Sequence, residues 1–377
     1  MQLKRDVFYI AGYDPRGYRY YYSLFKKNIA LQNKYHSQNY TLEKAKQATY
    51  PSWQIHAPNV TTSYTFLAWN DIVRQNWPKN IFAVLQDCFD FFRIYVITGL
   101  FFRFARSCKA PLIAGFYPFF YVLFSYLFVF LIIYYSFTFI AVKTHFIVAL
   151  IISFALIFLA SKLILKIGNK TAAFWLSRIC AFCARWSKGN IENINTRTDE
   201  FAEFIFKKLK QNSKEEKYEL ILVAHSVGTI LASSVAAKLI ALCKKTQCSY
   251  KALKILTLGE CIPLMSFHKS SNEFIQGLKE LSQEQDLIWF DFTSKIDGAC
   301  FYLVDFIKDT HIQDSKLKLK LLSTQFHKLY TPQEYQKIRR DWYRAHFLYL
   351  CASELKGRYD FFDFIAGENF LENKINL

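Results

Sequence analysis

The sequence is short of acidic residues and has none of the common signals of a nucleic-acid-binding protein. It contains 30 Asp and Glu against 48 Lys and Arg, which gives a formal net charge of +18. It has no block of five adjacent Lys or Arg, no zinc-finger spacing and no helix-turn-helix spacing, so nucleic acid is not the expected partner. It also has no internal repeat and no low-complexity linker. We therefore expect 377 residues to form one large domain with insertions, or two domains.

Metal-binding and secretion signals are also missing. Among the nine cysteines, only Cys180 and Cys183 have a spacing typical of metal or redox sites, and neither a second pair nor a histidine lies nearby. No apolar signal-peptide core follows the charged residues at the start of the sequence. The sequence therefore predicts no metal and no cofactor, and reduced cysteines in a protein that faces the cytosol.

The middle of the chain contains a long region without charge. No charged residue occurs from Pro111 to Val142 or from Phe146 to Ser161. Since about 20 apolar residues span a bilayer, we predict two transmembrane helices, 116–142 and 146–167, joined by a tight turn at Lys143-Thr144-His145. A re-entrant hairpin and a hairpin buried in a soluble core are the alternatives.

Cations flank the hairpin at both outer ends, which suggests lipid headgroups on one side of the membrane. By the positive-inside rule, the N-terminal and C-terminal parts then both face the cytoplasm and can fold together. Residues 91–107 resemble an interfacial helix. The composition further suggests a bacterial inner membrane. The flanking cations are Arg93, Arg103, Arg106, Lys109, Lys162, Lys166, Lys170 and Arg178.

The rest of the chain alternates predicted strands with predicted helices. This alternation favours an α/β fold, with a mostly parallel sheet covered by helices on both faces and interrupted by the hairpin. We divide the chain into 1–90, 91–170 and 171–377. The expected strands are 6–11, 53–56, 63–69, 220–224, 253–258 and 287–292, and the expected helices are 18–31, 71–92, 171–186, 199–210, 332–341 and 346–355.

Residues 220–229 carry the strongest chemical signal. An apolar strand runs from Leu220 to Ala224, stops at His225-Ser226-Val227-Gly228, and is followed at once by a helical pattern. A serine on such a sharp turn presents its hydroxyl beside the positive end of the helix dipole. Ser226 is therefore the predicted nucleophile, and His225 is expected to support the turn.

A serine nucleophile needs a base, and the base needs an acid to orient it. In the chain order typical of this turn, the acid follows the serine and the histidine comes last. Asp297, in a loop beyond a predicted strand, is favoured over Asp291 inside that strand. His346 is favoured over His327 as the base.

The developing oxyanion needs two backbone amides. Val227, directly after the nucleophile, is one expected donor. The loop from Gly12 to Gly17 follows the first strand, where Gly12 permits close approach and Tyr13 offers the second amide. Arg16 is the expected contact for a phosphate or carboxylate of the substrate. The alternative for this loop is an ordinary type I turn.

The chain resembles the α/β-hydrolase superfamily, in particular lipase-like serine esterases. The resemblance is carried by Val223-Ala-His-Ser-Val-Gly228 and by Leu256-Thr-Leu-Gly-Glu-Cys-Ile-Pro263, and it covers roughly 5–70 and 195–377. It implies a Ser-Asp-His triad, hydrolysis of an ester or thioester, and no metal. Ala224 replaces the usual first glycine of the turn, and no strand was evident before His346.

The combined expectation is a membrane-anchored serine hydrolase that cleaves a lipid or acyl ester through an acyl-enzyme. An acyltransferase that uses the same intermediate is one alternative. A non-catalytic membrane scaffold with a hydrolase fold is the other.

Overall fold

The computed structural model of the chain describes residues 2–44, 49–77, 80–143, 145–212 and 215–375. The chain forms two compact units, one of Met1–Asn76 with Arg185–Leu377 and one of Trp77–Ala184. The second unit is wider than the hairpin segment 91–170 expected from the sequence. It also includes the helices α3 (Ile81–Phe91) and most of α7 (Ala173–Trp186). Thr144, in the expected turn of the hairpin, lies outside the described residues.

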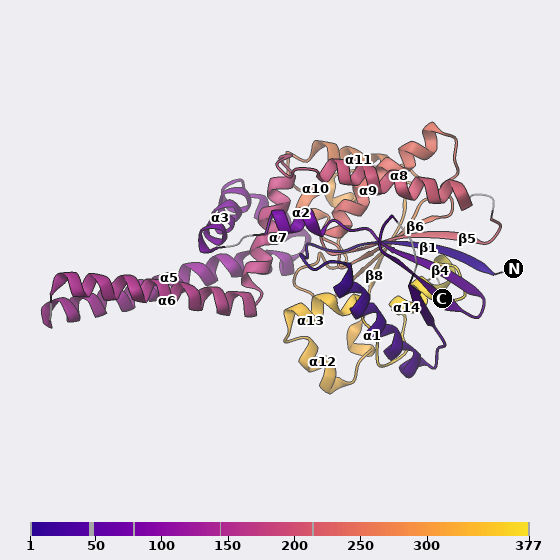
Figure 1. Cartoon of the computed structure of the whole chain (residues 1–377). Coiled ribbons are helices and arrows are strands. Elements are labelled where there is room, and N and C mark those ends of the chain that lie inside the picture. Colours follow the sequence, from indigo (N-terminus) through magenta and orange to yellow (C-terminus); the bar gives the residue numbers. More distant parts are fainter. Residues whose placement is uncertain (1, 45–48, 78–79, 144, 213–214, 376–377) are drawn as a thin grey trace. The chain divides into compact units, whose positions relative to one another are not determined.

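The first unit is built on one eight-stranded sheet, which confirms the α/β fold and its mostly parallel sheet (Figure 1). The strand order is β2-β3-β4-β1-β5-β6-β7-β8. The β2–β3 and β3–β4 pairs are antiparallel, and all the other pairs are parallel. The strands are β1 (Leu3–Ile10), β2 (Thr41–Lys44), β3 (Ser52–Ala57), β4 (Val60–Phe66), β5 (Tyr218–His225), β6 (Leu253–Leu258), β7 (Ile288–Thr293) and β8 (Lys318–Ser323).

The centre of this sheet is a fully buried strand pair. β1 lies between β4 and β5, and Ile10 is opposite Ala224 in the β1–β5 register. All eight residues of β5 are buried, as expected for a strand covered on both faces. The carboxyl ends of β1, β5, β6 and β7 therefore meet at one edge of the sheet, where the predicted site residues follow them.

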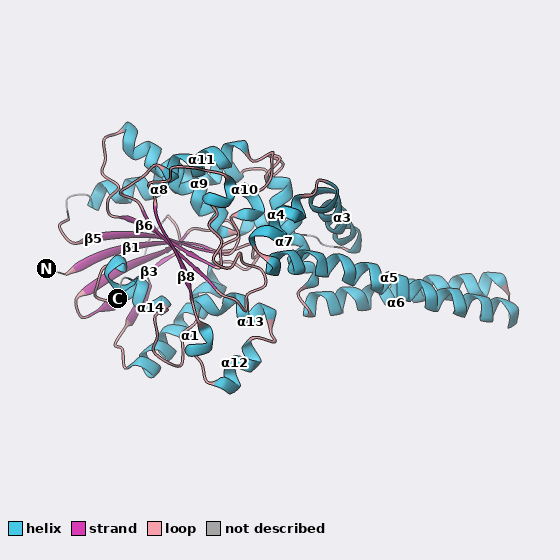
Figure 2. Cartoon of the chain, turned by 180° about the vertical axis from the view of Figure 1, so that it is seen from behind, coloured by secondary structure: helices cyan, strands magenta, loops and turns pink. Residues whose placement is uncertain are grey.

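Helices cover both faces of the sheet (Figures 1 and 2). One face carries α8, α9, α10 and α11, and the other carries α1, α12, α13 and α14. Their bounds are α1 (Tyr18–His36), α2 (Asn70–Gln75), α8 (Ile194–Asn212), α9 (Gly228–Lys245), α10 (Pro263–Ser266), α11 (Asn272–Ser282), α12 (Pro332–Ile338), α13 (Trp342–Phe347), α14 (Phe361–Ala366) and α15 (Leu371–Ile375).

The second unit contains two long apolar helices, α5 (Lys109–Lys143) and α6 (Phe146–Lys170). Both are long and apolar enough to cross a membrane, and only 11% of the most apolar 18-residue window of each is buried within the protein. Hydrogen bonds from two tyrosines of α5 link it to α6. The Tyr121 hydroxyl donates to the Ile164 carbonyl (2.7 Å), and the Tyr126 hydroxyl donates to Ser161 Oγ (3.2 Å).

The base of the hairpin is packed by its neighbouring helices, which explains the extent of this unit. A methyl group on Gly168 would lie 2.3 Å from the Phe174 ring, and one on Gly115 would lie 3.0 Å from the Phe91 ring. Arg178 is buried with its guanidinium 4.7 Å from the Trp77 ring, so the prediction that it faces lipid headgroups is wrong.

Several predicted elements differ from the observed ones. The expected helix 71–92 is two helices, α2 and α3, separated by a stretch that includes the undescribed residues 78–79. The expected interfacial helix 91–107 is a π-helix (Phe92–Ile97) and α4 (Leu100–Ser107), separated by Gly99 at a φ of +72°. The expected helix 346–355 is wrong, because α13 ends at Phe347 and a short 3-10 turn (Leu348–Leu350) follows.

Candidate active site

Ser226 sits on a sharp turn between β5 and α9. β5 ends at His225, α9 begins at Gly228, and Ser226 has a φ of +57°, in the left-handed region that non-glycine residues rarely adopt. The turn is possible because the start of α9 lies directly against the end of β1. A Cβ on Gly228 would come within 2.4 Å of the Ala11 carbonyl oxygen. Backbone strain of this kind is a recognised mark of functional positions.

Gly12 brings the backbone of the neighbouring loop into contact with the serine. A Cβ at this position would lie 2.8 Å from Ser226 Cβ and 3.2 Å from Ser226 Oγ. No larger residue fits there without a shift of the backbone. The loop after β1 and the turn after β5 therefore meet at the Ser226 hydroxyl, as the sequence suggested for Gly12.

The structure brings Asp297 and His346 together. His346 Nδ1 lies 2.9 Å from both carboxylate oxygens of Asp297, and both side chains are almost completely buried. The amide of Ala299 donates to Asp297 Oδ1 (3.0 Å). Burial acts to raise the pKa of the Asp297 carboxyl, but the charge of His346 and the hydrogen bonds outweigh it, so this pKa is lowered. Asp297 is therefore an anion that orients the imidazole of His346.

His225 also contacts His346, the predicted base. Its Nε2 lies 2.8 Å from the backbone carbonyl oxygen of His346, and the two ring centroids are 4.6 Å apart. Burial, reinforced by the charge of His346, lowers the pKa of His225 to about 3. The ring is neutral at ordinary pH, and because Nε2 faces a carbonyl it carries the proton. This contact links the turn at Ser226 to the backbone of His346.

The loop after β1 is held from several sides. The Trp69 indole donates to the Ala11 carbonyl (2.8 Å), and the Tyr13 hydroxyl donates to the Asn76 carbonyl (2.9 Å). Arg16 makes a two-pronged ion pair with Asp14, with contacts of 2.7 to 2.9 Å. The guanidinium that was expected to bind substrate therefore already has a carboxylate partner.

The guanidinium of Arg16 also lies between two aromatic rings. Its carbon is 3.8 Å from the Tyr20 centroid and 4.8 Å from the Phe347 centroid. Phe347 is the residue after His346. The pair with Asp14 and these stacking contacts thus connect the predicted oxyanion loop to the helix that carries the predicted base.

Val227 precedes the first residue of α9, with φ −56° and ψ −24°. Its amide belongs to the group of N–H donors at a helix start that have no partner within the helix. This is the donor type that an oxyanion site requires. Val227 itself is completely buried.

Asp291 and His327, the alternatives for the acid and the base, lie elsewhere. Asp291 is inside β7, where Thr257 Oγ1 donates to its Oδ1 (2.7 Å), and burial raises its pKa to about 8. His327 is exposed in the 3-10 turn Phe326–Lys328, with its ring 6.2 Å from that of Tyr335. Neither is among the groups that contact His346 or Ser226.

Two residues that the sequence did not predict contact Ser226, the predicted nucleophile. Cys261 Sγ lies 3.8 Å from Ser226 Oγ. Thr229 Oγ1 accepts from the Cys261 amide (3.1 Å) and donates to the Ser226 carbonyl (2.6 Å), so it links the turn to the loop after β6. The signal for Cys261 was its position, since it lies just beyond a strand that neighbours β5.

Among the described residues no group of three or more His, Cys, Asp or Glu side chains could hold a metal ion. No protein-family model matches the chain, and neither the curated proteins nor the solved structures contain a significant match. The function is therefore inferred from the geometry of the chain itself.

Proposed function

We propose that this chain is a serine hydrolase that cleaves an acyl ester through a covalent acyl-enzyme, with Ser226, His346 and Asp297 as its triad. The observation that carries the proposal is the buried His346–Asp297 pair, together with a serine in a left-handed turn at the carboxyl end of the central strand β5. An oriented imidazole and a serine held in this way are the parts that acyl transfer needs.

The proposed reaction has two balanced stages. With Nδ1 bound to Asp297, Nε2 of His346 takes the proton of Ser226 Oγ as this oxygen bonds to the ester carbonyl carbon. The tetrahedral intermediate collapses, the ester C–O bond breaks, and the imidazolium returns its proton to the leaving alcohol. Water then repeats the sequence on the acyl-enzyme and releases a carboxylic acid. The amides of Val227 and Tyr13 are the proposed oxyanion donors.

We further propose that α5 and α6 cross a membrane, that the first unit, which holds both chain ends, lies on the cytoplasmic side, and that the substrate is a lipid or other hydrophobic acyl ester. The long apolar faces of these helices support this, because exposed hydrocarbon of that extent is stable in lipid and not in water. Anchoring would concentrate the enzyme where such an ester dissolves. If the hairpin spans a bilayer, the protein stays in the membrane pellet after alkaline washing.

Active-site labelling tests the proposal. A fluorophosphonate probe should label the purified full chain, and labelling should disappear in Ser226→Ala and in His346→Ala but persist in Ser249→Ala, which changes an exposed serine beyond the end of α9. Unchanged labelling of Ser226→Ala would show that another residue is the nucleophile. Addition of competing alcohols during turnover, with analysis of the products, separates hydrolysis from acyl transfer to another acceptor.

A further inference from the structure

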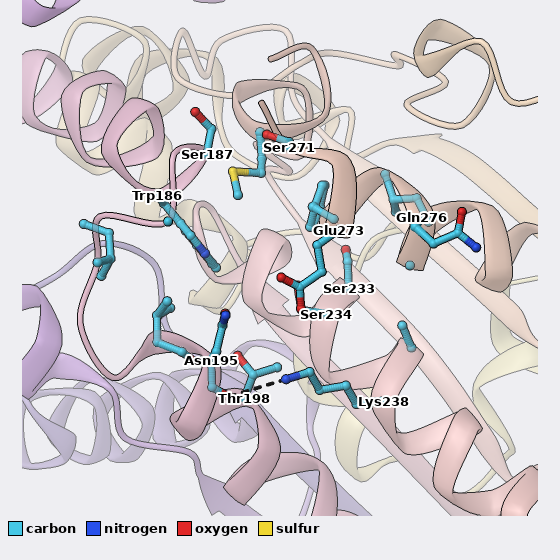
Figure 3. Close-up of a pocket in the computed structure, with 18 of the residues that line it drawn as sticks. Trp186, Ser187, Asn195, Thr198, Ser233, Ser234, Lys238, Ser271, Glu273 and Gln276 are labelled. Carbon is cyan, nitrogen blue, oxygen red and sulfur yellow. Dashed lines mark hydrogen bonds between the residues drawn. The ribbon is translucent and has the colours of Figure 1, made fainter. Parts of the chain in front are cut away.

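A groove of about 720 Å³ lies over the outer side of α9, between α8 and α11 (Figure 3). We refer to it as the α9 groove. Neither Ser226 nor His346 lines it. Ser233 is the first α9 residue in its wall and follows Ser226 by seven residues, or about 10 Å along a helix. Its size is within the usual range for small-molecule sites.

The hydroxyl protons of the α8 and α9 residues in this groove are already used inside those helices. Ser233 Oγ and Thr198 Oγ1 each donate to a backbone carbonyl one turn earlier (both 2.7 Å), and Ser234 Oγ does the same at 3.4 Å. What these side chains can offer a ligand is therefore the lone pairs of their oxygen atoms.

Two of the donors in the wall are also engaged, while a further lining cation, Lys188, is exposed to solvent. Lys238 Nζ lies 2.6 Å from Asp199 Oδ1, and Gln276 Nε2 donates to Glu280 Oε1 (3.0 Å). Glu273 adds a carboxylate, which extends from α11 over the groove in Figure 3. Glu280 also lines the groove. With Lys238 paired to Asp199, the two glutamates of the wall outnumber its one remaining lysine, Lys188, in a chain of net charge +18.

One buried hydroxyl gives an independent indication of a ligand. Ser271 lines the groove, is only 3% exposed, and its Oγ has no hydrogen-bond partner among the described residues. It precedes α11 but does not cap it. A buried polar atom without a partner costs about 1–3 kcal/mol, which a bound donor would recover.

The apolar part of the wall includes Trp186, Met265 and Phe274. Such a surface suits an alkyl chain, and the Trp186 indole is the side chain that binds organic cations best. A metal ion fits poorly, since no cluster of three ligating side chains exists in the part of the chain that the structure describes. An anion would meet the carboxylate of Glu273.

We propose that the α9 groove binds a primary alkylammonium ligand. Its N–H groups would donate to Glu273 and to the lone pairs of the α9 serines, and its alkyl part would lie along Trp186 and Phe274. This site is separate from the acyl chemistry proposed at Ser226 and does not depend on it.

Calorimetric titration of the full chain in detergent tests this proposal, with 1,5-diaminopentane as the probe and pentanoate and pentan-1-ol as matched controls. The diamine should bind and the two controls should not. Glu273→Gln should lower the affinity for the diamine at least about tenfold, as expected for loss of a charged hydrogen bond. Glu203→Gln, an exposed α8 glutamate that does not line the groove, should leave affinity unchanged.

The source of the ammonium group is distinguished by a second pair of probes. Glycerophosphoethanolamine carries N–H donors and glycerophosphocholine does not, so stronger binding of the former, lost in Glu273→Gln, would indicate a lipid headgroup; a preference for the free diamine would indicate a soluble amine. The proposal is overturned if neither amine binds, if pentanoate binds as well as the diamine, or if Glu273→Gln binds like the unmodified chain.

Discussion

The imidazole of His225 is hydrogen-bonded to the backbone of His346, with Nε2 2.8 Å from the carbonyl oxygen. The residue before the proposed nucleophile thus fixes the main chain of the proposed base, across 121 positions of sequence. Asp297 orients the His346 ring through Nδ1, so both the ring and the backbone of His346 are held. A base held at two points loses little orientational freedom when it acts, which favours proton transfer.

The depressed pKa of His225 predicts a pH dependence of stability. The unfolded chain binds a proton on this ring below pH 6.5, whereas the folded chain does so only near pH 3. The free energy of unfolding should therefore fall as the pH is lowered from 6.5 towards 5, by at most about 1.4 kcal/mol per pH unit from this group. Thermal unfolding at several pH values measures it, and His225→Phe should be less stable at pH 7 but flatter over this range. An equally steep profile in the variant would contradict the assignment.

Two aspartates offer a matched test of the acid. Asp297→Asn should reduce turnover at least about a thousandfold, because an amide neither stabilises the imidazolium nor fixes the correct tautomer. Asp291→Asn should change turnover little, since burial raises the pKa of that carboxyl to about 8 and an amide resembles its neutral form. Ester hydrolysis by the two purified variants gives the comparison. The reverse order of the two losses would assign the acid role to Asp291.

The contact between Gly12 and Ser226 predicts a steric effect on catalysis. Gly12→Ala would place a methyl group 2.8 Å from Ser226 Cβ, so the loop or the serine must move. We expect a loss of about a hundredfold in turnover, the size typical of a misplaced reacting group. Gly17→Ala is the control, because its methyl would meet its nearest neighbour, Asn70, at an ordinary 3.4 Å. Equal activity of the two variants would show that this contact is unimportant.

Adjacent residues of β1 should differ strongly in their effect on stability. Arg5 is fully buried, with Nε 2.7 Å from Glu219, and its other nitrogens donate to the carbonyls of Gly367 and Asn369. Arg5→Ala leaves Glu219 as an uncompensated buried charge and should cost about 3–5 kcal/mol in the free energy of unfolding. Lys4→Ala removes a half-exposed ion pair and should cost less than about 1 kcal/mol. Denaturant titration of both variants measures the two losses in the free energy of unfolding, and equal losses would contradict the prediction.

The central elements could be predicted because their signals are local. β5, the turn at Ser226 and α9 are contiguous in sequence, and the apolar run that ends in a small polar turn specifies all three. The two apolar helices were predicted for the same reason. Asp297 and His346 could be ranked from chain order and from the expected position of loops beyond the sheet edge.

Elements without a local signal were missed. β8 reads Lys-Leu-Lys-Leu-Leu-Ser, and the exposed lysines of this sheet-edge strand hide its strand character while protecting the edge. This is why His346 seemed to lack a preceding strand. The pairing of Arg16 with Asp14 and its stacking on Phe347 depend on distances between segments, which the sequence does not report.

The parallel pairing of β1 with β5 imposes an order of events during synthesis. The residues that join in this pair are separated by the whole of α5 and α6, because β1 lies before these helices and β5 after them. After the first four strands have been synthesised, the edge of β1 that pairs with β5 therefore stays unpaired until the ribosome has completed both apolar helices. Contacts between such distant segments form slowly. With the proposed insertion of the hairpin into a membrane, correct folding of the sheet depends on how soon the nascent hairpin leaves water, and a delay at that stage exposes β1 to pairing with other chains.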